Sequence, residues 1–168
     1  DVKGYVILTD KENMPETKLN NAMCYEDLIS EESDEFSWPE FDENTASSLC
    51  YTSGTTGNPK GVLYSHRSTI LHAWIVSSGN VAKVSSSTCI LPVVPMFHVN
   101  AWGIPYAGAM FGAKLVFPGP ALDGASVYEL IDNEKPDLLM GVPTVWLGLL
   151  QHLNETNQTL DCVETALV

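Results

Sequence analysis

The residues best suited to chemistry stand close together in one loop. The segment from Tyr51 to Gly61 reads YTSGTTGNPKG and lies between two short apolar runs. It supplies hydroxyl groups, glycines and one lysine: Thr52, Ser53, Gly54, Thr55, Thr56, Gly57 and Lys60. Glycines let a tight turn bring backbone N–H groups close to an anion, and the lysine adds positive charge. The loop therefore predicts a site for a polyphosphate.

Two other interpretations of this loop are disfavoured. The P-loop of many NTPases ends in Gly-Lys-Ser or Gly-Lys-Thr. Counted from Gly54, Pro59 stands where that glycine is required, and Gly61 stands where the hydroxyl residue is required. A flexible linker is disfavoured too, because apolar runs flank the loop and Pro-Lys-Gly closes it.

Composition narrows the class of protein. The chain has 168 residues and a net charge of −13, from 8 basic and 21 acidic side chains. Such acidity argues against nucleic acid and against anionic membrane surfaces as partners. No apolar run approaches the roughly 20 residues of a membrane-spanning helix. The cysteines form no CxxC pair, so we expect reduced thiols in a cytoplasmic protein.

Strands alternate with helices along most of the chain. Apolar runs predict strands at residues 4–9, 48–52, 61–64, 89–94, 114–117 and 138–140. Helices are expected at 25–29, after a capping Ser65, at 100–111, at 125–134 and from Pro143 onward. This order predicts an α/β fold around a largely parallel sheet. We expect an N-terminal strand and acidic connector over 1–45, and the α/β portion over 46–168.

The loop resembles the signature loop of the adenylate-forming superfamily, which comprises acyl-CoA synthetases, firefly luciferase and the adenylation domains of peptide synthetases. The segment PMFH at 95–98 resembles the family's Phe-His motif at the acyl pocket, and GVPT at 141–144 resembles the strand-to-helix turn that follows it. The run PMFHVNAW, ending at Trp102, is most similar to long- and medium-chain fatty acyl-CoA synthetases. The resemblance implies part of the large N-terminal domain of such an enzyme.

That resemblance implies a two-step reaction and a role for each matching residue. A carboxylate would attack the α-phosphate of ATP, and the thiol of CoA would then take the acyl group. Thr52 would bind Mg²⁺, residues 53–57 would surround the β- and γ-phosphates, and Lys60 would help to neutralise them. His98 would be the catalytic residue beside the carboxylate or adenylate. Val99 and Trp102 would line the acyl pocket, with Trp102 as a gate. The full-length enzyme could pair as a homodimer.

Several of these residues have an ordinary structural alternative. Lysines are mostly exposed, and a histidine among apolar residues is more often packed in a core. Trp102 could pack in the core as Trp74 and Trp146 would. The other histidines, at 66, 72 and 152, match no family motif and are assigned structural roles.

The chain does not contain every motif of the family. No adenine-binding strand, Thr-Glu segment, ribose-binding Asp or C-terminal lysine follows Val168. The ends are interpreted as cuts, with the C-terminal part of the enzyme absent, and the fragment alone is expected to be inactive. The alternatives are an aryl- or short-chain acid-CoA ligase, a non-catalytic phosphate- or nucleotide-binding module, and an interaction piece.

Overall fold

The protein is described here by a computed structural model, which covers residues 2–52 and 57–168. The chain divides into two compact units, Asp1–Glu40 and Phe41–Val168. In the described ranges, none of the helices combines the length and apolar character needed to cross a membrane.

The first unit is small and has little core. Strand β1 (Tyr5–Ile7) pairs in parallel with β2 (Ala22–Cys24), and α1 (Tyr25–Ile29) follows directly. The buried Cys24 thiol donates a hydrogen bond to the Thr9 carbonyl oxygen at 2.9 Å. The predicted N-terminal strand and helical turn are confirmed, and residues 31–44 form neither helix nor strand.

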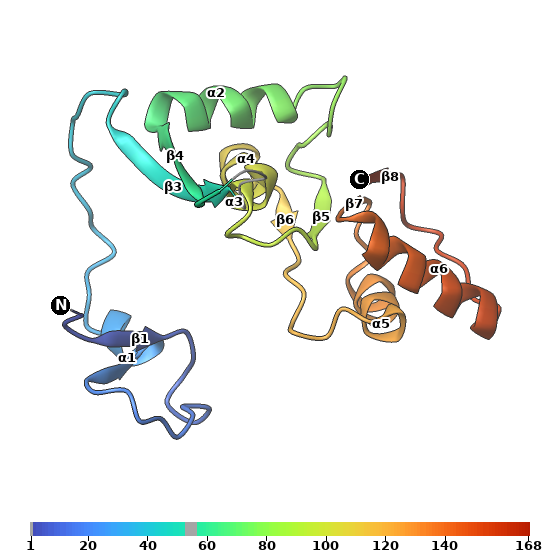
Figure 1. Cartoon of the computed structure of the whole chain (residues 1–168), viewed down its shortest axis with the longest axis horizontal. Helices are drawn as coiled ribbons and strands as arrows, with labels where there is room; N and C mark the ends of the chain where they lie inside the picture. The colour runs from blue at the N-terminus through green and yellow to red at the C-terminus, as the bar shows by residue number, and fades with distance from the viewer. Residues whose placement is uncertain (1, 53–56) are drawn as a thin grey trace. The chain divides into compact units, whose positions relative to one another are not determined.

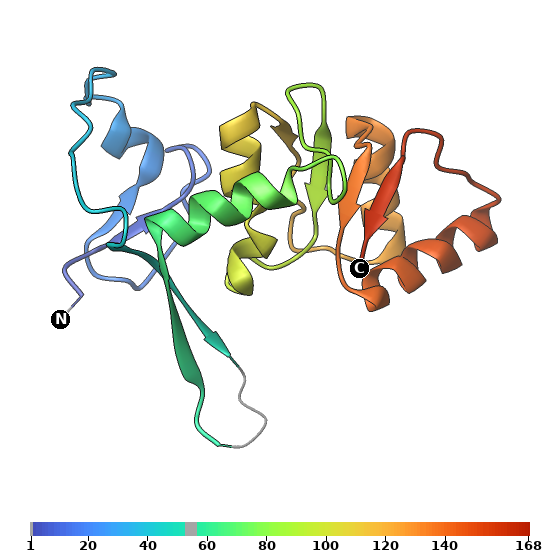
Figure 2. The same ribbon diagram turned by 90° about the horizontal axis from the view of Figure 1, so that it is seen from above.

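The second unit begins with a two-stranded ribbon. Strand β3 (Ala46–Thr52) pairs antiparallel with β4 (Lys60–Ser65), so that Thr52 stands opposite Lys60. Figure 2 shows the ribbon apart from the main sheet. Both strands were predicted, and they pair with each other rather than extending the parallel sheet.

Helix α2 (His66–Val76) starts at the predicted cap. The Ser65 hydroxyl accepts a hydrogen bond from the Ser68 backbone N–H at 3.1 Å, and the Ser68 hydroxyl accepts one from the Ser65 N–H at 3.0 Å. This reciprocal arrangement satisfies donors that the first turn of a helix leaves free.

The packing face of α2 differs from the one that its large apolar residues suggest. Ala73 and Val76 are buried, whereas the larger apolar side chains that fall at helical spacing are exposed: Ile70, Leu71, Trp74 and Ile75. Ala73 and Val76 pack in one buried cluster with Ile104 and Ala107, and this contact rather than the larger apolar side chains defines the buried face of α2.

A four-stranded parallel sheet forms the centre of this unit. It consists of β5 (Cys89–Pro92), β6 (Lys114–Leu115), β7 (Leu138–Met140) and β8 (Thr165–Leu167), in the order β6-β5-β7-β8. All three pairings are parallel. The predicted α/β class with a largely parallel sheet is thereby confirmed (Figure 1).

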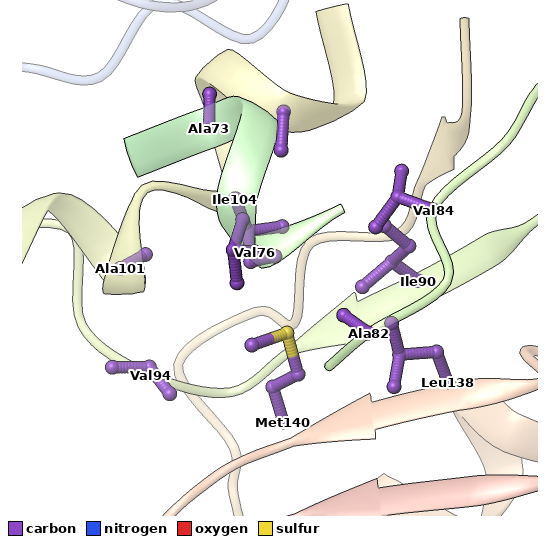
Figure 3. Packing of buried hydrophobic residues seen from close by; sticks show 11 residues of the cluster. Ala73, Val76, Ala82, Val84, Ile90, Val94, Ala101, Ile104, Leu138 and Met140 are labelled. Atoms are coloured by element: carbon purple, nitrogen blue, oxygen red, sulfur yellow. The ribbon is translucent and has the colours of Figure 1, made fainter. Parts of the chain in front are cut away.

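Helices cover both faces of the sheet, and the pleat separates two cores. Side chains alternate between faces along a strand. Ile90, Leu138 and Met140 join one buried cluster with residues of α2 and of α4 (Ile104–Phe111), as Figure 3 shows. Their neighbours Leu91 and Leu139 join the other cluster, with residues of α5 (Gly124–Glu134) and α6 (Pro143–Thr156).

The predicted continuous helix over 100–111 is wrong in its first turn. Residues Val99–Trp102, labelled α3, have φ angles of 50°, 50°, 49° and 56°, which form a left-handed turn. Gly103, with φ +73°, then leads into the right-handed α4. Left-handed backbone costs roughly 1–2 kcal/mol for each residue that bears a Cβ, so specific contacts must hold the turn.

The cap of α2 offers a direct test of this local structure. Replacing Ser65 with alanine leaves the N–H of Ser68 without its acceptor, and we expect a loss of about 1 kcal/mol in the free energy of unfolding. Ser65→Asn restores a capping oxygen and should keep the original stability. Urea denaturation of both variants measures the difference, and equal stability of the alanine and asparagine variants would contradict the capping role.

Candidate functional site

The carboxyl ends of β5 and β7 define where a ligand can bind. The chain passes from β5 to β6 on one side and then crosses to β7 and β8 on the other. In open α/β sheets, ligands bind beyond the carboxyl ends of the strands where the order of strands reverses in this way. The PMFH segment follows β5 and the GVPT segment follows β7.

The two segments are fixed at this edge of the sheet. The Val93 N–H donates to the Met140 carbonyl oxygen at 2.7 Å, which ties the ends of β5 and β7 together. The Trp146 indole Nε1–H donates to the Gly141 carbonyl oxygen at 3.1 Å and so holds the turn into α6. Trp146 therefore has a structural role, as predicted, and packs against the cluster that includes Leu149.

The ribbon brings both ends of the predicted phosphate loop side by side. Thr52 and Lys60 are cross-strand partners, and the Thr52 Oγ1–H donates to the Lys60 carbonyl oxygen at 3.4 Å. Gly57 has φ +138°, a conformation open to glycine and strained for other residues. The predicted residues Ser53, Gly54, Thr55 and Thr56 lie outside the described residues.

Lys60 brings positive charge to this end of the ribbon. In residues 2–52 and 57–168, ion pairs engage Arg67 with Glu43, Lys114 with Glu134 and Lys135 with Asp132, and none includes Lys60. The Lys60 residue is exposed, so its ammonium group can approach an anion held between the strand ends.

One cavity of about 430 Å³ joins the ribbon to the segment after β5. Thr52 and His98 both line it, and its remaining lining is mostly apolar: Cys50, Tyr51, Pro59, Val62, Tyr64, Phe97 and Val99. His98 is exposed, and its backbone N–H donates to the Pro95 carbonyl oxygen at 3.0 Å. The structure thus brings together two predicted site residues that are 46 positions apart in the sequence.

A second cavity, of about 230 Å³, lies between α2 and the left-handed turn. Val99 and Tyr64 line both cavities. The second cavity is also bordered by His72, Asn100 and Tyr106. Most of the surface that lines it is apolar, and the polar groups of Ser68, Thr69, His72 and Asn100 lie at its border.

Trp102 is half-buried and packs against the apolar cluster that includes Ala73 and Ile104. Its backbone carbonyl oxygen accepts a hydrogen bond from His72 Nε2 at 3.0 Å. Because a carbonyl oxygen can only accept, Nε2 of His72 carries the proton. The described linings of the two cavities do not include Trp102.

Sequence reasoning missed the contribution of Asn100 and the position of His72. Asn100 lies in the left-handed turn and bonds to β3, and His72 lines the second cavity as well as holding the turn. Asparagine is one of the few residues that tolerate left-handed backbone, which is the signal that could have drawn attention to position 100. The sequence gives no comparable indication for His72, because α2 contacts the left-handed turn only in the folded chain.

The described residues include no group of three or more His, Cys, Asp or Glu side chains arranged to hold a metal ion. A protein-only metal centre is therefore not evident in that part of the chain. The Thr52 hydroxyl remains a hard oxygen donor of the kind that Mg²⁺ uses alongside phosphate oxygens and water. Elsewhere in the sheet, burial raises the pKa of the Cys89 thiol, which favours its protonated, unreactive form.

The sequence matches known proteins over almost its whole length. Residues 3–167 match the family model described as AMP-binding enzyme, and the chain belongs to that family. It is 56% identical over 149 residues to the medium-chain-fatty-acid–CoA ligase of Ectopseudomonas oleovorans, covering 89% of this chain and 27% of that protein. It is 48% identical over 168 residues to the 3-methylmercaptopropionyl-CoA ligase of Ruegeria lacuscaerulensis, covering 100% of this chain and 31% of that protein.

Solved structures agree with the fold. The inhibitor-bound N-terminal domain of FACL13 from Mycobacterium tuberculosis matches with a TM-score of 0.68 and 27% identity, over 85% of this chain and 35% of that one. The predicted membership of the adenylate-forming superfamily is thus confirmed. The chain spans less than a third of the length of the two curated relatives named above.

The contact between Gly103 and His72 yields a test of the site's geometry. A Cβ at Gly103 would lie 2.5 Å from His72 Cδ2, so Gly103→Ala must displace the imidazole from the Trp102 carbonyl. Gly112→Ala is the matched control, because Gly112 has nearly the same φ, +72°, and its nearest neighbour would lie 3.7 Å away.

We expect the Gly103 variant to be less stable than the Gly112 variant by about 1 kcal/mol, the usual contribution of one hydrogen bond. Urea denaturation of the two proteins measures this difference. Equal midpoints for the two variants would show that the His72 contact does not hold the turn.

Proposed function

We propose that this chain forms the phosphate-loop portion of an ATP-dependent fatty acid–CoA ligase. In this reaction a carboxylate attacks the α-phosphate of ATP, giving acyl-adenylate and pyrophosphate. The thiol of CoA then attacks the acyl carbon and releases AMP. The proposal rests on the names of the two curated relatives reported above, of whose length this chain covers less than a third.

The observation that carries the proposal is the shared cavity of Thr52 and His98. The ribbon supplies hydroxyl and ammonium groups suited to phosphate oxygens. The segment after β5 supplies an imidazole and apolar surface suited to the acid. A reaction that joins a carboxylate to a nucleotide requires both kinds of surface at one place.

At the ribbon, the residues would act by electrostatics rather than by covalent chemistry. Attack on the α-phosphate gathers negative charge on phosphate oxygens, so nearby cations and N–H donors lower the barrier. Lys60 would stabilise the β- and γ-phosphates, and the N–H groups of residues 53–57 would surround them. The Thr52 hydroxyl would be the protein's ligand to Mg²⁺, an ion that supplies further charge neutralisation when bound with ATP.

On the opposite side of the cavity, His98 would contact the substrate carboxylate or the adenylate. Its imidazole can donate a hydrogen bond to a carboxylate oxygen and so orient that oxygen toward the phosphorus. The alkyl chain would extend past Val99, which lines both cavities, into the apolar space beside α2. Trp102 would limit access to that space from the turn.

The remaining parts of the proposal concern the whole enzyme. We propose that the chain alone neither adenylates nor forms thioester, because the adenine-binding strand and the Thr-Glu segment of the family are not in it. We further propose a cytoplasmic enzyme that pairs as a homodimer at full length. Free thiols at Cys24, Cys50, Cys89 and Cys162 support a reducing location.

A short-chain acid is the second candidate substrate. The 48% identity to a 3-methylmercaptopropionyl-CoA ligase favours it, since that name denotes a short thioether acid. The 56% identity to a medium-chain ligase and the apolar second cavity favour the longer chain. Assays of CoA thioester formation with acids of graded chain length therefore distinguish the two candidate substrates.

If Thr52 and Lys60 bind the phosphates of ATP, replacing either residue should slow the formation of acyl-adenylate. In the full-length gene product, Thr52→Ala and Lys60→Ala should each lower fatty-acid-dependent ATP–pyrophosphate exchange by roughly 10²-fold, the effect of removing one charge-stabilising group. Lys18→Ala, an exposed lysine in the first unit, should leave exchange unchanged. Exchange that survives both site substitutions would exclude the loop assignment.

The acyl-binding role predicts a preference for chain length. We expect kcat/KM for CoA thioester formation to be highest with medium-chain fatty acids and lower with 3-methylmercaptopropionate and benzoate. Trp102→Ala should flatten this preference, whereas Trp74→Ala, whose exposed side chain lies on α2, should not. If kcat/KM were highest with 3-methylmercaptopropionate or with benzoate, that acid and not a fatty acid would be the substrate.

A further inference from the structure

The left-handed turn at Val99–Trp102 is an unusual structure for these residues. Four consecutive residues with a Cβ have φ near +50°, and Val99 is β-branched, which makes that conformation least favourable. Strained backbone of this kind persists only where surrounding contacts fix it, and such sites are often functional. The contacts that fix this turn therefore identify residues of interest.

The side chain of Asn100 supplies the longest-range of these contacts. Its Nδ2 donates to Ser48 Oγ at 2.8 Å, and its Oδ1 accepts from the Cys50 thiol at 3.2 Å. Ser48 and Cys50 both lie on β3, 52 and 50 residues away along the chain. The half-buried amide thus uses both of its polar ends on the strand that leads into Thr52.

The turn holds three groups that the proposed reaction needs. His98 precedes it, Val99 lies between the two cavities, and Trp102 ends it. Rotation of the turn would therefore change the shape of the acyl side of the site. The strand β3 has independent support, because it pairs with β4 from Ala46 to Thr52.

We propose that Asn100 is a positioning residue that anchors the left-handed turn to β3 and thereby shapes the acyl-binding side of the site. The inference rests on the proposed ligase function. Without the amide, the turn loses its link to β3 while the β3–β4 pairing keeps the phosphate-binding side in place. Asn100 therefore governs fatty-acid binding far more than ATP binding.

The test uses the full-length gene product with Asn100→Ala and Asn100→Gly. Glycine accepts the left-handed backbone without strain, so the glycine variant removes the two hydrogen bonds, and the part of the cavity lining that the amide forms, without adding backbone strain. We expect both variants to raise the KM for the fatty acid roughly tenfold, as the loss of two modest hydrogen bonds implies. The KM for ATP should change by less than about twofold, which separates positioning from general damage.

Ser48→Ala tests the partner on the strand. It should raise the KM for the fatty acid by a smaller factor, and adding it to Asn100→Gly should have no further effect, because both changes break the same contact. Asn157→Ala is the matched control. Asn157 is an exposed asparagine with φ 56° at the end of α6, and its replacement should leave both KM values unchanged.

Hydrogen exchange provides a readout that does not depend on catalysis. In Asn100→Gly the amides of residues 98–103 should exchange faster, and those of 46–52 should keep their rates. If the wild-type protein forms no CoA thioester with any fatty acid, the proposed function fails, and hydrogen exchange still decides whether Asn100 anchors the turn. Unchanged exchange over 98–103, or a wild-type KM for the fatty acid in Asn100→Gly, overturns the inference.

Discussion

The pairing of β5 with β7 is the interaction on which the rest of the site depends. Their side chains are buried on both faces of the sheet, and the register Ile90↔Leu138, Leu91↔Leu139, Pro92↔Met140 aligns their carboxyl ends. Burial of apolar side chains from both strands drives this pairing. It brings the end of β5, which leads into the segment with His98, and the end of β7, which leads into the turn before α6, to the same edge of the sheet, at the point where the order of strands reverses. A substitution that misaligned the two strands would therefore disturb the site without touching a site residue.

A second constraint connects this sheet edge to the ribbon of β3 and β4. The ribbon is not part of the main sheet, so side chains must determine where it lies relative to the segment after β5. Asn100 bonds to β3, and Tyr64 of β4 lines both cavities together with Val99. Because these contacts come from residues of the left-handed turn, the same contacts that fix the strained backbone also fix the geometry of the site. The hydrogen bonds to Asn100 and to the Trp102 carbonyl oxygen, together with the burial of Ala101, act against the cost of the turn.

Much of the fold could be predicted from the sequence, because local patterns encode it. The apolar runs predicted most of the strands but not β2, Ser65 and Pro143 marked the starts of helices, and the alternation of elements predicted the parallel sheet. The left-handed turn was not predicted, since the residues from Asn100 to Phe111 are mostly as apolar and small as those of a buried helix, and only Asn100 marks the exception. The packing face of α2 was not predicted either, because the burial of Ala73 depends on contacts that form only in the folded chain. At the site, the loop and His98 were recognisable as motifs, whereas Asn100 and His72 owe their positions to contacts distant in sequence.

We propose that the ribbon binds the nucleotide and that the segment after β5 binds the acid, within the cavity lined by both Thr52 and His98. A crystal structure of the full-length protein with a non-hydrolysable fatty acyl-adenylate analogue tests it most directly. We predict that the phosphate of the analogue lies at the end of the ribbon beside Thr52, that its acyl carbonyl lies beside His98, and that its alkyl chain passes Val99 toward His72. An analogue bound elsewhere, or one whose alkyl chain leaves the cavity beside α2 empty, would contradict this account.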